Sequence, residues 1–228
     1  DDDQVRKSIA ARTAPQAPSL EGEPVDDGVR EIIGAKNAGA RSPDARRLKI
    51  CFVTREFSGP FGAGGVGTAA TATAEMLAAA GHEVDVVFVP YHRHNILDWF
   101  WTGFFAARGI RLHQFSLTGP GGGGLSLGKI MRKVKQVVVA NRYDVVHVDD
   151  AHAIGAHLCQ LRGCGLALRS TAVAMTTHGC SYWHAYKGNM PIENSMAEFH
   201  HGFEQQNYLA DLTIHPSRYM QDWVNANV

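Results

Sequence analysis

Residues 48–67, LKICFVTREFSGPFGAGGVG, decide the fold of this chain. The run at residues 48–54 is almost continuously apolar and includes Ile and Val, which predicts a strand buried on both faces. A glycine-rich loop follows, and residues 68–80 are rich in Ala, Thr, Met and Leu up to Gly81, which predicts a helix. A buried strand that leads through a glycine-rich loop into a helix is typical of the first unit of a parallel α/β sheet.

The same alternation of strand and helix patterns continues to the end of the chain. We expect further strands at residues 82–90, 110–117, 143–148, 172–177 and 212–214, and further helices at residues 95–108, 125–141, 152–161, 190–209 and 217–225. This repetition predicts an α/β fold, a Rossmann-like parallel sheet with helices on both faces. Ligands bind such sheets at the carboxyl ends of the strands, where the strand order reverses.

Residues 1–47 differ in composition from the rest of the chain. They contain no aromatic residue and no Cys, although the whole chain has ten Phe, six Tyr and four Trp. Because they offer too little apolar area for a core, we expect a leader or linker at residues 1–47, partly disordered or packed on the domain. Residues 48–228 are then the folded domain.

Composition excludes several classes of protein. The chain is 45% hydrophobic and 19% charged, which is ordinary for a globular protein. There is no apolar run of ~18 residues, and the first residues are acidic, so neither a membrane span nor a signal peptide is indicated. Lys and Arg total 22, as do Asp and Glu, and this balance gives no support for a nucleic-acid partner.

The cysteines and histidines do not show the spacing of a metal site. Cys51, Cys159, Cys164 and Cys180 form no C-x-x-C motif and have apolar neighbours, so we expect four reduced core thiols and a cytoplasmic protein. The twelve His lack paired helical spacing with a third ligand, so we expect no metal.

The glycine-rich loop before residue 68 is the first candidate site. Glycines let the backbone approach an anion, and a helix N-terminus presents unpaired N–H groups, which together suit a diphosphate. A tight turn without a ligand remains the alternative. Gly62, Gly64 and Gly67 match a dinucleotide-binding pattern in form but lie too far from the strand. Residues 123–130, GGLSLGKI, resemble a P-loop but end in Ile130, so we expect a surface loop.

Polar clusters follow the expected fourth and fifth strands. They bring two carboxylates and two or three imidazoles to the same edge as the glycine-rich loop, from among Asp149, Asp150, His147, His152 and His178. Imidazole can hydrogen-bond sugar hydroxyls or donate to a phosphate oxygen, and a carboxylate can orient it. The structural alternative is that Asp150 or His152 caps the next helix and His178 bonds to the backbone.

Five segments in this order resemble the N-terminal domain of family 4 retaining glycosyltransferases, the group that includes glycogen and starch synthases. They are KICFVTREFSGPFGAGGVGT, AEMLAAAGHEVDVVFVP, YDVVHVDDAH, MTTHG and ADLTIHPSRYM. The resemblance covers about residues 48–228. It implies one half of a GT-B fold, with the acceptor side of the cleft in this chain and a C-terminal Rossmann-like domain that binds the donor.

The resemblance also implies roles for particular residues. Gly64 and Gly65 would lie against the donor diphosphate, His178 beside the donor sugar, and Asp150 and His152 in the same cleft. The family uses no metal and no cofactor; its substrates are a nucleotide sugar and a carbohydrate or glycolipid acceptor. We therefore expect this chain alone to be inactive.

Two departures and two alternatives accompany the resemblance. Gly62 stands where glycogen synthases have Lys, and Ala151 stands where they have Trp, which favours an acceptor other than a glucan. The family's E-x7-E motif belongs to the C-terminal domain. The alternatives are a non-catalytic Rossmann-like module that binds a glycan or nucleotide, and half of a nucleotide-sugar epimerase.

Two aromatic segments remain. The aromatic side chains at residues 99–105 fit one buried face of a connecting helix, with docking of a membrane or lipid acceptor as the alternative. Residues 180–189, CSYWHAYKGN, have no regular period, so we expect a loop whose aromatic rings either stack on a sugar or close the loop.

Overall fold

The computed structural model describes residues 46–59, 64–89, 99–114, 126–191 and 194–228. Residues 1–45 of the expected leader, residues 1–47, lie outside this part of the chain. The strands are β1 (Lys49–Thr54), β2 (Glu83–Phe88), β3 (Ile110–Gln114), β4 (Val145–Asp149), β5 (Ala172–Thr176) and β6 (Leu212–Ile214). The helices are α3 (Gly65–Ala79), α4 (Trp99–Ala106), α5 (Leu127–Asn141), η3 (Ala151–Ala153), α6 (Ala156–Gly163), α7 (Ser181–Gly188), α8 (Asn194–Leu209) and α9 (Arg218–Asn227).

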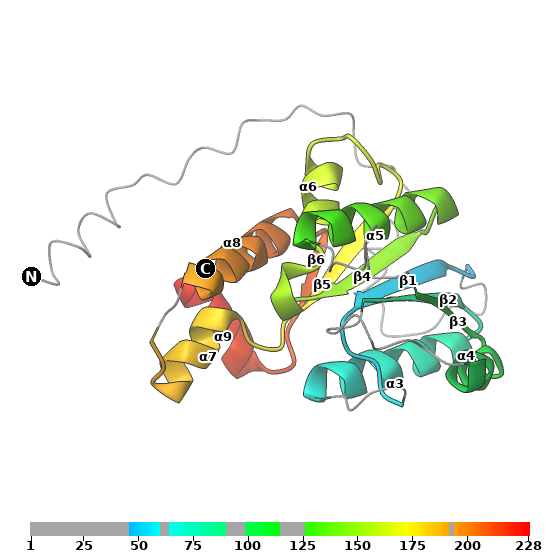
Figure 1. The fold of residues 1–228 in the computed structure, drawn as a ribbon, viewed down its shortest axis with the longest axis horizontal. Coiled ribbons are helices and arrows are strands. Elements are labelled where there is room, and N and C mark those ends of the chain that lie inside the picture. The colour runs from blue at the N-terminus through cyan, green and yellow to red at the C-terminus, as the bar shows by residue number, and fades with distance from the viewer. Residues whose placement is uncertain (1–45, 60–63, 90–98, 115–125, 192–193) are drawn as a thin grey trace, which may run out of the picture.

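The six strands form one parallel sheet in the order β3-β2-β1-β4-β5-β6 (Figure 1). The predicted parallel α/β fold is therefore confirmed. β1 and β4 are neighbours, with Phe52 opposite His147. The strand order reverses between these two strands, because β2 and β3 extend from the far side of β1. This is the place in such a sheet where ligands bind.

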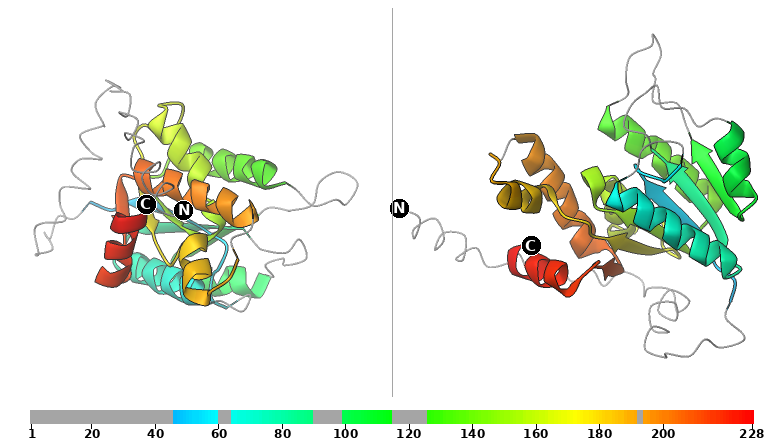
Figure 2. Two further views of the ribbon diagram at one scale, coloured as in Figure 1. Left: turned by 90° about the vertical axis from the view of Figure 1, so that its left-hand side faces the viewer. Right: turned by 90° about the horizontal axis from the view of Figure 1, so that it is seen from below.

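Helices cover both faces of the sheet, as predicted (Figures 1 and 2). α3 and α4 pack on one face, where Ala74 and Phe105 join the alternate strand residues Ile50 and Phe52 in one core cluster. α5 and α6 pack on the other face, where Val134 and other helix residues share a second core cluster with the strand residues whose side chains point to that face. Every β1 residue from Ile50 onward is buried, which explains the continuous apolar run in its sequence.

Three expectations about local structure are wrong. Residues 181–188 form α7 and not a loop, and the Cys180 thiol caps this helix through a hydrogen bond that its Sγ accepts from the Trp183 N–H. A single helix at residues 152–161 is replaced by the short η3 and then α6. Cys164 is exposed, whereas Cys51, Cys159 and Cys180 are buried free thiols as expected.

The aromatic helix α4 has one buried and one exposed side. Phe105 is almost fully buried, whereas Trp99 is 86% exposed. Burial of one face is confirmed for this helix, and residues 95–98 of the expected helix lie outside the described residues. Of the P-loop-like segment, residues 127–130 are the first turn of α5, and residues 123–125 are not described. No helix in the described part of the chain is long and apolar enough to cross a membrane.

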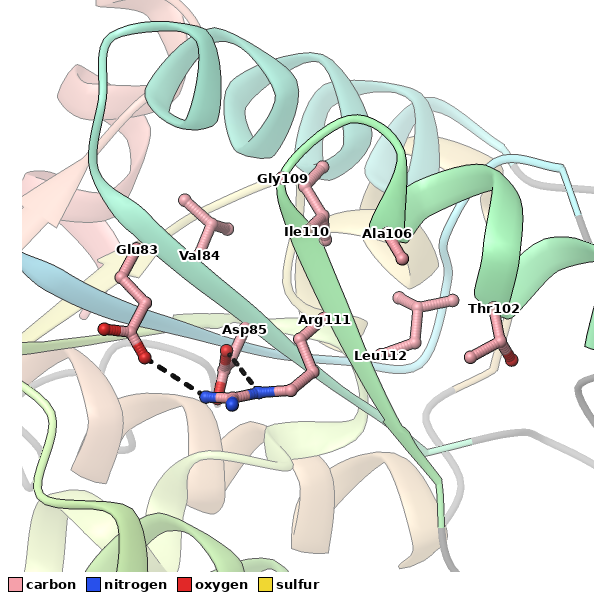
Figure 3. Close-up of a pocket in the computed structure, with 9 residues that line it drawn as sticks. All are labelled: Glu83, Val84, Asp85, Thr102, Ala106, Gly109, Ile110, Arg111 and Leu112. Carbon is pink, nitrogen blue, oxygen red and sulfur yellow. Dashed lines mark hydrogen bonds and ion pairs between the residues drawn. The ribbon is translucent and has the colours of Figure 1, made fainter.

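A shallow groove lies toward the amino ends of β2 and β3 (Figure 3). Beside it, the buried Asp85 carboxylate accepts hydrogen bonds from Arg111, His113 and Tyr143. Burial alone would raise the pKa of Asp85, but these hydrogen bonds outweigh it and lower the pKa to about 2. All these polar groups are partnered with one another, so the cluster joins β2, β3 and the start of β4.

Candidate functional site

Residues that follow β1, β4 and β5 meet at the carboxyl edge of the sheet. The register places Val53 opposite Val148 and Asp149 opposite Thr176. The loops after these strands therefore leave the sheet side by side, next to the point where the strand order reverses. The predicted convergence of the glycine-rich loop with the two polar clusters is what this arrangement produces.

The glycines after β1 lie at the N-terminus of α3. Gly64 is the N-cap and Gly65 is the first helical residue, and both are exposed. The Glu56 carboxylate accepts hydrogen bonds from the N–H groups of Gly64, at 2.9 Å, and Gly67, at 3.3 Å. A carboxylate of the chain itself thus uses part of the positive helix end that we expected to face a diphosphate. Apart from Gly65 itself, its neighbours in the chain and the nearby backbone of α3, no described atom lies within 4 Å of the place a Cβ on Gly65 would take, so the backbone is open to approach there.

The turn after β4 carries Asp150 and His152 on an unusual backbone. His152 has a φ of 53° and Ala153 a φ of 51°, so two successive residues with side chains adopt the left-handed conformation. Each costs on the order of 1–3 kcal/mol. The chain returns to right-handed geometry at Ile154, which has a φ of -62° and precedes Gly155, the N-cap of α6. Such a turn persists only where the surrounding contacts hold it.

The Asp150 carboxylate joins this turn to the loop that carries His178. Its Oδ2 accepts hydrogen bonds from the backbone N–H of His178, at 2.8 Å, and of Gly179, at 2.9 Å. Burial raises the pKa of Asp150, and the two N–H groups oppose that shift. Asp150 makes no side-chain capping bond to η3, so the capping alternative does not hold for this residue. Its contacts are those of a residue that positions the His178 loop.

Asp149 places a second carboxyl group beneath the site. The side chain is 2% exposed, its Oδ1 accepts a hydrogen bond from the Ala151 N–H, and its Oδ2 has no hydrogen-bond partner among the described residues. Burial raises the pKa of Asp149 to about 7, and the nearby charges of Asp150 and Glu56 add to the shift. This carboxyl group therefore takes up a proton near neutral pH.

The imidazoles of the site are held in the neutral form. Burial lowers the pKa of His178 and of His152, although the negative charge of Glu56 acts in the opposite direction on both. Burial also lowers the pKa of His147 to about 4, and its Nε2 lies 2.7 Å from the Thr176 hydroxyl. A neutral imidazole has one donor and one acceptor nitrogen, so it can bond a sugar hydroxyl or donate to a phosphate oxygen.

The structure therefore brings together the predicted residues Gly64, Gly65, Asp150, His152 and His178. It adds Glu56, which the sequence reasoning missed. Its position in the sequence could have indicated it. Glu56 is the second residue after β1 and precedes Gly64 by eight residues, which is close enough for its carboxylate to reach the N-terminus of the next helix. In the described ranges, no three His, Cys, Asp or Glu side chains are grouped so that they could hold a metal ion.

Comparisons with known proteins agree with this geometry. The sequence model described as Glycosyltransferase Family 4 matches residues 63–228. A search of curated proteins found no match. Among solved structures, the chain is similar to UGT73P12 of Glycyrrhiza uralensis in complex with glycyrrhetinic acid 3-O-monoglucuronide, with a TM-score of 0.50 and 10% sequence identity. The aligned region covers 79% of this chain and 46% of that one, so this chain spans less than half the length of that protein, and the likeness concerns the fold alone. The family match extends over most of the chain and includes every predicted site residue: the chain belongs to Glycosyltransferase Family 4.

Proposed function

We propose that this chain forms the acceptor side of a glycosyltransferase cleft that transfers a sugar from a nucleotide-sugar donor with retention of anomeric configuration. The observation that carries the proposal is the meeting of an exposed Gly64-Gly65 helix N-terminus with three neutral imidazoles and Asp150 at the reversal point of the sheet. Family membership supports the reaction class, and the position of these groups at the strand-order reversal supports the proposed place of the site.

The helix end and the imidazoles have distinct roles in this proposal. The first four N–H groups of a helix lack intrahelical partners, and Glu56 binds those of Gly64 and Gly67. We assign the N–H groups of Gly65 and the next residue to oxygens of the donor diphosphate. Neutral His178 would hydrogen-bond the donor sugar, and His152 would face the same cleft. Since the leaving phosphate can itself accept the acceptor's proton, positioning and phosphate stabilisation supply most of the catalysis.

A second Rossmann-like domain would supply the donor side of the cleft. This is supported by the length comparison, because the aligned region covers 46% of the UGT73P12 chain. The proposed substrates are a nucleotide sugar and a carbohydrate or glycolipid acceptor, with no metal and no further cofactor. The three buried free thiols fit a reducing compartment, so we place the reaction in the cytoplasm.

A transfer assay with anomeric analysis tests this function. We expect the polypeptide that joins this chain to a donor-binding domain to release nucleoside diphosphate from a nucleotide sugar. The product, followed by proton NMR, should keep the donor's anomeric configuration. The 228-residue chain alone should give no more than background turnover. Transfer with inversion would contradict the proposed chemistry, and robust transfer by the 228-residue chain would contradict the need for a second domain.

A further inference from the structure

Gln206 of α8 closes the left-handed turn that carries Asp150 and His152. Its side chain is fully buried. Oε1 accepts a hydrogen bond from the Gly155 N–H at 2.7 Å, and Nε2 donates to the Asp149 carbonyl at 3.3 Å. Because a backbone N–H is only a donor, the atom facing Gly155 must be the amide oxygen, which fixes the orientation of the amide. One side chain thus bonds the residue just before the turn and the residue just after it.

The same face of α8 contacts the turn at two further points. A Cβ on Gly202 would lie 2.4 Å from the Cβ of Ala153, so the helix backbone rests directly on the strained turn. The Phe199 ring meets the His152 ring edge to face, with 4.9 Å between the centroids. Phe199, Gly202 and Gln206 follow one another at spacings of three and four residues, which places them on one helix face. We call this the α8 clamp.

We propose that Gln206 is a positioning residue for the transfer reaction and that it acts through this turn. A buried amide is costly unless it is hydrogen-bonded, and here both of its ends bond the backbone of the turn. The same turn carries Asp150, whose carboxylate accepts hydrogen bonds from the backbone N–H groups of the His178 loop. Loss of the amide therefore displaces His152 directly and His178 through Asp150. The reaction itself rests on the function proposed above.

Gln206→Met tests the proposal, because Met keeps the length of the side chain and removes both hydrogen bonds. We expect kcat of the joined polypeptide to fall roughly 10- to 100-fold with little change in KM for the donor, since displacement of about 1 Å in a reacting group has effects of this size. The matched control is Val138→Ala. Val138 is fully buried on α5, so this substitution leaves a cavity in the core and destabilises the fold away from the site. It should lose stability while keeping kcat.

Two further readouts keep the test decisive. In ¹⁵N NMR of the 228-residue chain, Gln206→Met should shift the Gly155 amide and the His152 ring nitrogens, and Val138→Ala should leave them in place. The NMR readout does not need activity. If the wild-type protein shows no sugar transfer, the proposed function is overturned, and the NMR spectra still test whether Gln206 positions the turn.

If Gln206→Met does not fold, Gln206→Glu takes its place. The protonated carboxyl group of Glu can both accept and donate a hydrogen bond, so the kcat of this variant relative to wild type should rise as the pH falls. A kcat within twofold of wild type for folded Gln206→Met, a pH-independent ratio for Gln206→Glu, or unmoved Gly155 and His152 signals would each overturn the proposal.

Discussion

His178→Ala is expected to lower kcat for sugar transfer by about 100-fold or more while leaving the fold intact. The imidazole is the part of this residue that we place beside the donor sugar, and removal of one positioned hydrogen-bonding group from an active site commonly has an effect of this size. The structural contact of residue 178 is made by its backbone N–H, which bonds Asp150 and is kept in the variant. His178→Ala should therefore lower activity without affecting folding.

The measurement is kcat at saturating donor in the joined polypeptide, together with a thermal unfolding curve. His201→Ala is the matched control, because the His201 side chain is 70% exposed on α8 and its Nδ1 lies 3.6 Å from the Glu204 carboxylate. It should keep the wild-type rate. A wild-type rate in His178→Ala would remove His178 from the site, and a large fall in melting temperature would show that the ring is structural.

Asp149→Asn is expected to change how stability depends on pH. In the folded chain the pKa of Asp149 is about 7, mainly because of burial, whereas in the unfolded chain it returns to about 4. Between these values the folded state keeps a proton that the unfolded state has lost. The stabilisation from that proton is complete below about pH 4 and is lost as the pH rises through about 7.

The neutral Asn has no proton to lose, so the variant gains stability relative to wild type as the pH rises. We expect the difference in free energy of unfolding to grow by roughly 3–4 kcal/mol from pH 4 to pH 8. Urea unfolding of the 228-residue chain at several pH values measures it. The comparison must be between variants, because His147, whose pKa burial lowers to about 4, acts in the opposite direction in both proteins.

Asp222→Asn serves as the control for this experiment, since Asp222 is an exposed carboxylate on α9. Its difference from wild type should stay nearly constant over the same pH range. An equally flat difference for Asp149→Asn would show that Asp149 is ionised in the folded chain throughout, and the account of a buried protonated carboxyl group would then be wrong.

The sheet could be predicted from the sequence because its signal is local. Residues 48–54 read as a strand since both faces are buried, and the observed β1 is Lys49–Thr54. The same reasoning located the site, because the carboxyl ends of parallel strands share one edge. Asp150, His178 and the glycine-rich loop were placed together on that ground, and the family resemblance singled out Gly64 within the loop.

The detail of the site could not be predicted, because it depends on contacts between distant segments. A left-handed conformation is usually predicted from a glycine in the sequence, and neither His152 nor Ala153 is one. Their conformation is held by contacts with Gln206 and Gly202, some fifty residues away. The capping of α3 by Glu56 likewise needs the loop to fold back on itself. α7 was missed because its apolar residues have no helical period and the Cys180 cap is an uncommon one.

A crystal structure of the joined polypeptide with a nucleotide-sugar donor tests the central claim most directly. We predict that the diphosphate lies within hydrogen-bond distance of the Gly65 N–H and that the sugar lies beside His178. A donor bound in the groove beside Arg111, or anywhere that leaves His178 without a contact to the sugar, would contradict the account.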